Sequence, residues 1–163
     1  MPPYRLQTLL EMRERTKKEA EDAFSAAVKL VKKEKDELAR MEAELVQRKA
    51  ERKQKVLAYL QQVMAKGNAG VSGFNQMNRY EERLKDEEAQ LALDIERQKE
   101  TVKNAEKAME QRRHEMAEAA KELKAIEKHK ENWQKAIKAD RQSKEDLNQE
   151  EIGNTLFLMR QRK

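Results

Sequence analysis

The distribution of helix-breaking residues constrains this 163-residue chain more than any other feature. Its only prolines are Pro2 and Pro3, and three of its four glycines, Gly67, Gly70 and Gly73, lie close together. Proline and glycine interrupt regular helices, so the long stretches without them permit two long helices. Charged residues make up 41% of the chain and aromatic residues only 4%. This composition leaves too little apolar material for a thick globular core and is typical of long helices or coiled coils.

The glycine-rich segment 67–73 divides the chain into two arms. We expect a helix over about residues 4–66 and a second over about 74–148, the second capped by Ser72 or Asn75. Apolar residues of the second arm recur at alternating steps of four and three, the repeat of a left-handed coiled coil. This seam runs through Leu84, Leu91, Ile95, Val102, Ala105, Met109, Met116, Ala119, Leu123, Ile126, Trp133, Ile137 and Leu147.

The first arm carries a weaker seam that matches the second. A short loop between two long amphipathic helices favours an antiparallel hairpin, in which paired residue numbers sum to about 140. This register pairs Leu38 with Val102 and places the intruding charge of Arg52 beside Glu88. The sequence therefore predicts an all-α fold, a single elongated two-helix coiled-coil hairpin. The seam of the first arm comprises Ala20, Phe24, Ala27, Val31, Leu38, Met41 and Leu45, interrupted by Glu34, Arg48, Arg52 and Lys55.

The same register leaves the end of the second arm without a partner. Leu6 is expected near Trp133, so residues beyond about Ile137 run past the N-terminus. We expect a monomer with a C-terminal docking segment over 149–163, but a frayed end, or pairing of the unpaired seam between two chains, stays open. Three apolar residues lie at helical spacing in this segment: Ile152, Leu156 and Met159.

No constellation of residues suits catalysis. The chain has no cysteine for a thiolate nucleophile. Its two histidines, His114 and His129, would lie about 22 Å apart along one helix and cannot share a metal, so we expect them on solvated faces. The glycine segment lacks the Lys-Ser/Thr of a phosphate loop. We expect no enzyme activity, metal or cofactor. Because no stretch has the length of a bilayer span or a secretory signal, we expect a cytoplasmic protein without direct membrane insertion.

The net charge of +5 falls on the first arm, with basic runs at Lys29–Lys35 and Arg48–Lys55. A basic arm of this kind is one footprint of nucleic-acid binding. The runs contain acids, Glu34 and Glu51, and no interleaved aromatic residues. We therefore expect no nucleic-acid partner and favour an acidic protein surface, with the nucleic-acid arm as an alternative.

Two further groups of residues allow a structural or a binding role. Trp133 lies on the seam and is either a packed core residue or an anchor for a partner. Apolar residues crowd the loop end, where they either seal the tip of the hairpin or form a second contact surface. These residues are Tyr59, Val63, Met64, Phe74, Met77 and Tyr80.

Short segments of the chain resemble a known family. The opening Tyr4-Arg5-Leu6-Gln7-Thr8-Leu9-Leu10-Glu11-Met12-Arg13 is similar to the start of type III secretion ATPase stalk proteins of the YscO/FliJ type. Those chains typically begin with Tyr/Phe-x-Leu-x-x-Leu-Leu-x-x-Arg. The segments Lys130–Ala136 and Glu150–Asn154 resemble the injectisome branch, and the likeness in length and layout covers the whole chain.

The resemblance implies a non-enzymatic central stalk in the cytoplasm, at the inner-membrane base of the secretion apparatus. Its termini would enter a hexameric secretion ATPase and stimulate hydrolysis, while the tip would face the export gate or export chaperones. A generic coiled-coil tether is the alternative. The residues that would contact the ATPase are Leu6, Leu9, Leu10 and Arg13, and more weakly Trp133, Ile152 and Leu156. Those that would contact the gate or a chaperone are Tyr59, Val63, Met64, Phe74 and Met77.

Overall fold

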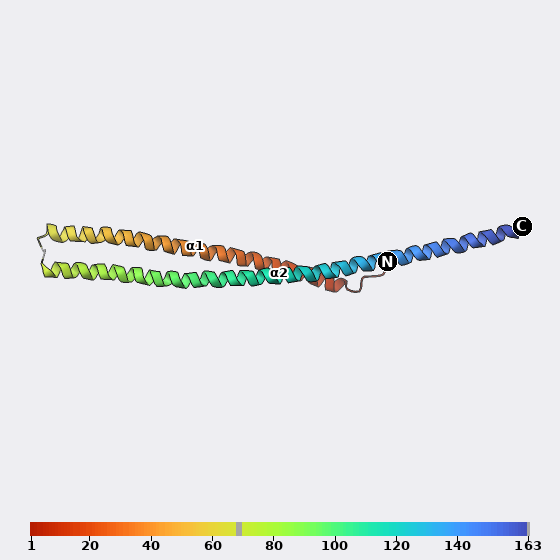
Figure 1. Cartoon of the computed structure of the whole chain (residues 1–163), viewed down its shortest axis with the longest axis horizontal. Coiled ribbons are helices and arrows are strands. Elements are labelled where there is room, and N and C mark those ends of the chain that lie inside the picture. Colours follow the sequence, from red (N-terminus) through yellow and green to blue (C-terminus); the bar gives the residue numbers. More distant parts are fainter. Residues whose placement is uncertain (68–69, 163) are drawn as a thin grey trace. The chain divides into compact units, whose positions relative to one another are not determined.

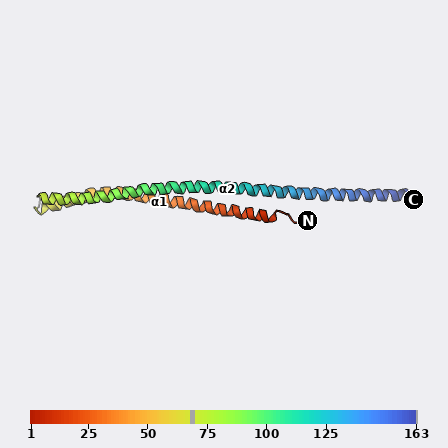
Figure 2. The same ribbon diagram turned by 90° about the horizontal axis from the view of Figure 1, so that it is seen from below.

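The structure, a computed structural model, describes residues 1–67 and 70–162. Within these residues it consists of helix α1, Gln7–Ala65, and helix α2, Val71–Gln161, with no strand. The two helices pack against each other in opposite directions, and the segment between Ala65 and Val71 connects them (Figures 1 and 2). The predicted all-α fold, a long antiparallel two-helix hairpin, is confirmed.

Glycine residues define both helix ends at the turn. Gly67 has a φ of 67°, the left-handed conformation that commonly ends helices, and its N–H donates to the carbonyl of Met64 at 3.2 Å. Across the turn, the carbonyl of Gly70 accepts from Gly73 N–H at 3.0 Å and from Phe74 N–H at 3.3 Å. Residues 68 and 69 of the predicted turn lie outside the described residues.

Helix α2 therefore begins at Val71 rather than near residue 74. The prediction that Ser72 or Asn75 caps this helix is wrong, because both residues lie inside its first turns. Glycine is tolerated at the capping position almost as well as the polar residues, which allows Gly70 to start the helix.

The C-terminal part of α2 is also longer than expected. The helix continues to Gln161 instead of ending near residue 148, and it includes Gly153. No proline follows residue 3, and one glycine costs only about 1 kcal/mol relative to alanine. This is too little to end a helix that has good helix formers within three residues on both sides, Glu151 before the glycine and Leu156 after it. The expected docking segment 149–163 is thus helical up to Gln161, and its last residue lies outside the described residues.

Contacts divide the chain into two compact units, residues 22–113 and residues 1–21 with 114–163. Each unit has a thin core along the helix–helix seam. In α2, buried and half-buried residues follow the predicted steps of four and three from Leu84 to Ile137, with the exception of the exposed Arg112. The buried apolar residues are Val31, Leu91, Ile95, Val102 and Ala105 in the first unit, and Tyr4, Leu10, Ala119 and Leu123 in the second.

Two polar layers interrupt the apolar seam of the unit 22–113. Arg52 and Glu88 meet as predicted, with Nε and Oε1 3.0 Å apart. Both atoms are buried, and their contact is an ion pair without the alignment of a hydrogen bond. In the other layer, the amide of Gln98 donates to the Glu34 carboxylate at 2.6 Å and to the Glu34 backbone carbonyl at 3.0 Å. Glu34, which interrupts the seam of α1, thus has a partner across the hairpin.

Candidate partner-binding surfaces

An aromatic cluster joins the N-terminus to α2. Tyr4 is buried, and its ring centroid lies 5.0 Å from that of Trp133. The Tyr4 hydroxyl lies 2.6 Å from Nδ1 of His129. The Lys130 ammonium lies 5.9 Å from the centroid of the Tyr4 ring and donates to Oε1 of Gln7 at 2.9 Å. These contacts fix the first residues of the chain, which precede α1, against one face of α2.

The cluster differs in detail from the sequence prediction. Leu6 was expected near Trp133, and the ring contact with Trp133 is made by Tyr4, two residues earlier in the chain. Trp133 is half-buried and packs within the chain, which agrees with its core interpretation. His129 is exposed, as expected of a helix-face residue, but its ring has a specific partner in Tyr4. Sequence reasoning missed this partner because it expected the helix to begin at about residue 4, whereas α1 begins at Gln7 and Tyr4 precedes it.

The cluster predicts a clear difference between two substitutions of Tyr4. Tyr4→Phe removes only the hydroxyl contact and should lower the free energy of unfolding by about 1 kcal/mol. Tyr4→Ala also removes the ring and should cost about 3 kcal/mol. Urea unfolding followed by the fluorescence of Trp133, the only tryptophan, measures both. Equal stability of the two variants would show that the ring does not pack on Trp133.

The residues of the opening pattern lie partly inside the unit. Leu10 is only 5% exposed, and Leu6 and Leu9 are half-buried. Arg13 forms an ion pair with Glu122 of α2. The residues of the opening pattern therefore contribute to the packing of α1 against α2. Only the exposed parts of their side chains can contact another protein.

Beyond Ile137, every described residue of α2 is exposed, including Leu147 of the predicted seam, because α1 does not extend along this part of the helix. Pro2, at the start of the chain, shares a shallow surface pocket with residues as far along the helix as Asn148. Within the described residues of the unit, no other segment contacts the last turns of α2 (blue in Figure 1). This part of the helix ends in four consecutive large apolar residues, Leu156, Phe157, Leu158 and Met159, each between 55% and 62% exposed. Four consecutive residues cover a full helical turn, so this turn is apolar on all sides. A helix that is apolar all round is normally enclosed by other protein.

Charges flank the apolar turn with opposite signs. Glu145, Asp146, Glu150 and Glu151 precede it, without any Lys or Arg among residues 145–151. Arg160 and Arg162 follow it, and Arg160 lies in the last turn of the helix, where a positive charge complements the helix dipole.

Elsewhere in the described residues, many charged side chains pair with a neighbour of opposite sign. Arg48 pairs with Glu44 at 2.9 Å, and Arg52 pairs with Glu88. The hydrogen bond from Arg40 lowers the pKa of the Glu37 carboxyl, and Lys135 lowers the pKa of Glu131 in the same way. In each case the pKa shift comes from an exposed neighbour on the same helix, as is common for surface ion pairs, and does not indicate an active site. Among the described residues no group of three or more acidic, histidine or cysteine side chains is placed to hold a metal ion.

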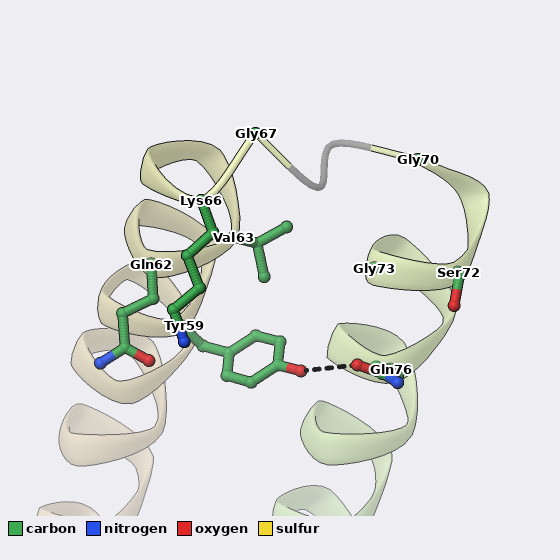
Figure 3. A pocket seen from close by; sticks show the side chains of 9 residues that line it. All are labelled: Tyr59, Gln62, Val63, Lys66, Gly67, Gly70, Ser72, Gly73 and Gln76. Atoms are coloured by element: carbon green, nitrogen blue, oxygen red, sulfur yellow. Dashed lines mark hydrogen bonds between the residues drawn. The ribbon is translucent and has the colours of Figure 1, made fainter.

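The turn between the helices forms an open pocket of about 560 Å³ (Figure 3). The Tyr59 hydroxyl donates to Oε1 of Gln76 at 3.4 Å across it, and the Tyr59 ring stacks on Tyr80 at 5.6 Å between centroids. Of the predicted contact residues, Tyr59, Val63 and Met77 are half-buried, whereas Met64 and Phe74 are exposed. The pocket is lined by Tyr59, Gln62, Val63, Lys66, Gly67, Gly70, Ser72, Gly73 and Gln76.

Neither helix, over the described part of the chain, contains an apolar stretch of the length that a bilayer span requires.

No curated protein matches the chain. The chain is similar in structure to a solved structure described as that of a YscO homologue, CT670, from Chlamydia trachomatis. The two sequences are 23% identical, and the match covers 100% of this chain and 99% of the other with a TM-score of 0.78. At this identity the likeness shows a shared fold. The model of the YscO-like protein family matches residues 1–163. The chain therefore belongs to the YscO-like family of type III secretion stalk proteins.

Proposed function

We propose that this protein is the central stalk of a type III secretion ATPase, in the cytoplasm at the inner-membrane base of the apparatus. The C-terminal end of α2 enters the central hole of the hexameric ATPase and stimulates hydrolysis. One observation carries the proposal: the turn Leu156–Met159 is apolar on every side and entirely uncovered within the chain. Its burial by a partner would stabilise the complex by roughly 25 cal/mol for each Å² of apolar surface removed from water.

A ring suits this turn better than a groove does. A groove on one protein covers a single stripe of a helix and would leave Phe157 or Leu158 in water. Subunits arranged around a hole contact all sides of the helix at once. Because a helix is not six-fold symmetric, each subunit meets different side chains. The stalk can thus impose different states on the subunits without a catalytic residue of its own.

The N-terminal residues play a supporting part in this proposal. Tyr4 and Leu10 hold the start of the chain on α2. The exposed edges of Leu6, Leu9 and Arg13, together with Trp133, would then line the mouth of the hole beside the inserted helix. Ile152 and Leu156 lie on the inserted part itself.

We assign the loop end of the hairpin, in the unit 22–113, to the export gate or to an export chaperone. Met64, Val71 and Phe74 are exposed apolar side chains at this end. Tyr59, Val63 and Met77 are half-buried, and Tyr59 links the two helices through Gln76 and Tyr80. A generic tether would use both ends of the hairpin without changing ATP hydrolysis.

Titration of the full-length protein into the purified secretion ATPase of the same organism tests the proposal. Hydrolysis per ATPase subunit should rise and saturate near one stalk for each hexamer. Measurement of the ATPase mass under the same conditions establishes that the hexamer is present. Unchanged hydrolysis by an intact hexamer would contradict the stalk function and favour the tether.

A further inference from the structure

We propose that, in the free protein, the end of α2 pairs antiparallel with the same segment of a second copy. The segment concerned is 145–162, which we call the tail helix. Ile152, Leu156 and Met159 follow one another at steps of four and three, and so form a stripe along one face. All three side chains are exposed within the chain. This is the seam of a coiled coil that lacks its second helix.

The charges of the tail helix indicate that the missing partner helix is the tail helix of a second copy. They also indicate that the two tail helices run antiparallel. The part before the stripe carries only acidic charges, and the part after it carries Arg160 and Arg162. Parallel pairing of two copies would bring like charges together, which is unfavourable. Antiparallel pairing places the acidic part of each copy along the basic part of the other. The segment is therefore complementary to itself in one direction only.

A specific register satisfies both the stripe and the charges. With Leu156 of one copy beside Ile152 of the other, residue numbers in the core layers sum to 308. Asp146 then flanks Arg160 of the second copy, and the two-fold symmetry makes this ion pair twice. Gln149 and Met159 form a core layer in the same register.

The position of Gly153 is a separate observation that supports this register. A Cβ atom at this position would meet nothing within 4 Å in the chain, so no packing within the chain requires a glycine. Glycine nevertheless costs the helix about 1 kcal/mol relative to alanine. In the proposed register Gly153 lies on the flank of the interface next to the two-fold axis, where it faces its own copy. The missing side chain lets the two helix backbones approach closely there.

This inference does not rest on the proposed ATPase contact. The pairing covers the stripe and leaves Phe157 and Leu158 on its outer side. Variants of the stripe therefore test self-association, and variants of these two residues test the ATPase contact separately.

Sedimentation equilibrium of the full chain over a concentration series tests the pairing. We expect the mass to rise from 19.2 kDa towards twice that value, and Leu156→Glu to return it to the monomer. Leu93→Glu is the matched control, because Leu93 is equally exposed at 55% and lies outside the tail helix; it should leave the dimer intact. A monomer at concentrations up to about 0.1 mM, or a dimer that survives Leu156→Glu, would overturn the proposal.

Cross-linking tests the direction of pairing, since the chain has no cysteine of its own. Gln149→Cys and Met159→Cys are prepared as separate single variants. Antiparallel pairing predicts a disulfide-linked dimer when the two variants are mixed under mild oxidation, and little when either is oxidised alone. Efficient linkage of each variant to itself would show parallel pairing and refute the proposed register.

Discussion

Replacement of both Phe157 and Leu158 by glutamate is expected to abolish stimulation of the secretion ATPase at stalk concentrations that saturate the wild type. Burial of each side chain in the hole would contribute about 1.5–3 kcal/mol, so loss of both should weaken binding by at least about 100-fold. Both side chains are exposed in the free protein, at 60% and 58%, so helicity and melting should be unchanged. The measurement is the stalk concentration that gives half-maximal hydrolysis.

The matched control replaces Val46 and Leu93 by glutamate. These residues are also exposed apolar side chains, at 70% and 55%, but they lie in the unit 22–113. The control variant should stimulate the ATPase as the wild type does. If both double variants lost stimulation equally, a general effect of added negative charge would replace the proposed contact at the end of α2.

Substitution of Leu10 would not give the same information, although the opening pattern points to it as an ATPase contact. Leu10 is buried against α2, so a charged side chain there would open the unit itself. Loss of stimulation by such a variant would follow from unfolding as readily as from a lost contact. The exposed end of α2 is the cleaner place to separate the two effects.

The helix–helix seam was predictable because it follows from spacing alone. The steps of four and three identify the face of α2 that is buried in the structure. The register in which paired residue numbers sum to about 140 predicts the observed contact of Arg52 with Glu88. The exposure of Ile152 and Leu156 followed from the same register, because α1 is too short to reach them. Their contact with an ATPase stays a prediction, since a hairpin register says nothing about another molecule.

The errors arose where the heptad repeat does not apply. Tyr4 precedes α1, and its contact with Trp133 depends on an irregular segment that no repeat describes. The start of α2 at Val71, with Gly70 as its cap, depends on a choice among several adequate capping residues, whose energies differ by only a few tenths of a kcal/mol. Helix α2 continues past the expected end near residue 148, because no proline follows and the single Gly153 costs only about 1 kcal/mol.

Arg52→Ala is expected to lower the free energy of unfolding by about 3 kcal/mol, because it leaves the buried Glu88 carboxylate without its counter-charge. Arg52→Met combined with Glu88→Leu should recover most of this loss, since apolar residues of similar volume often replace a buried ion pair without penalty. Urea unfolding followed by circular dichroism measures both. Arg48→Ala is the control: its ion pair with Glu44 is exposed, so its loss should cost less than about 1 kcal/mol.

The ion pair between Arg52 and Glu88 can also fix the register of the hairpin, which gives a reason for charged residues in an apolar seam. A slip of the hairpin by one heptad would place Glu88 opposite Leu45 or Tyr59, and in neither register would it meet a cation. The ion pair thus favours one register over its neighbours, while a purely apolar layer would tolerate all three. Cysteines at Leu38 and Val102 should link in nearly every molecule of the wild-type background and in fewer molecules of the Arg52→Met, Glu88→Leu background. Equal linkage in both would show that the remaining layers, such as Gln98 with Glu34, set the register without this pair.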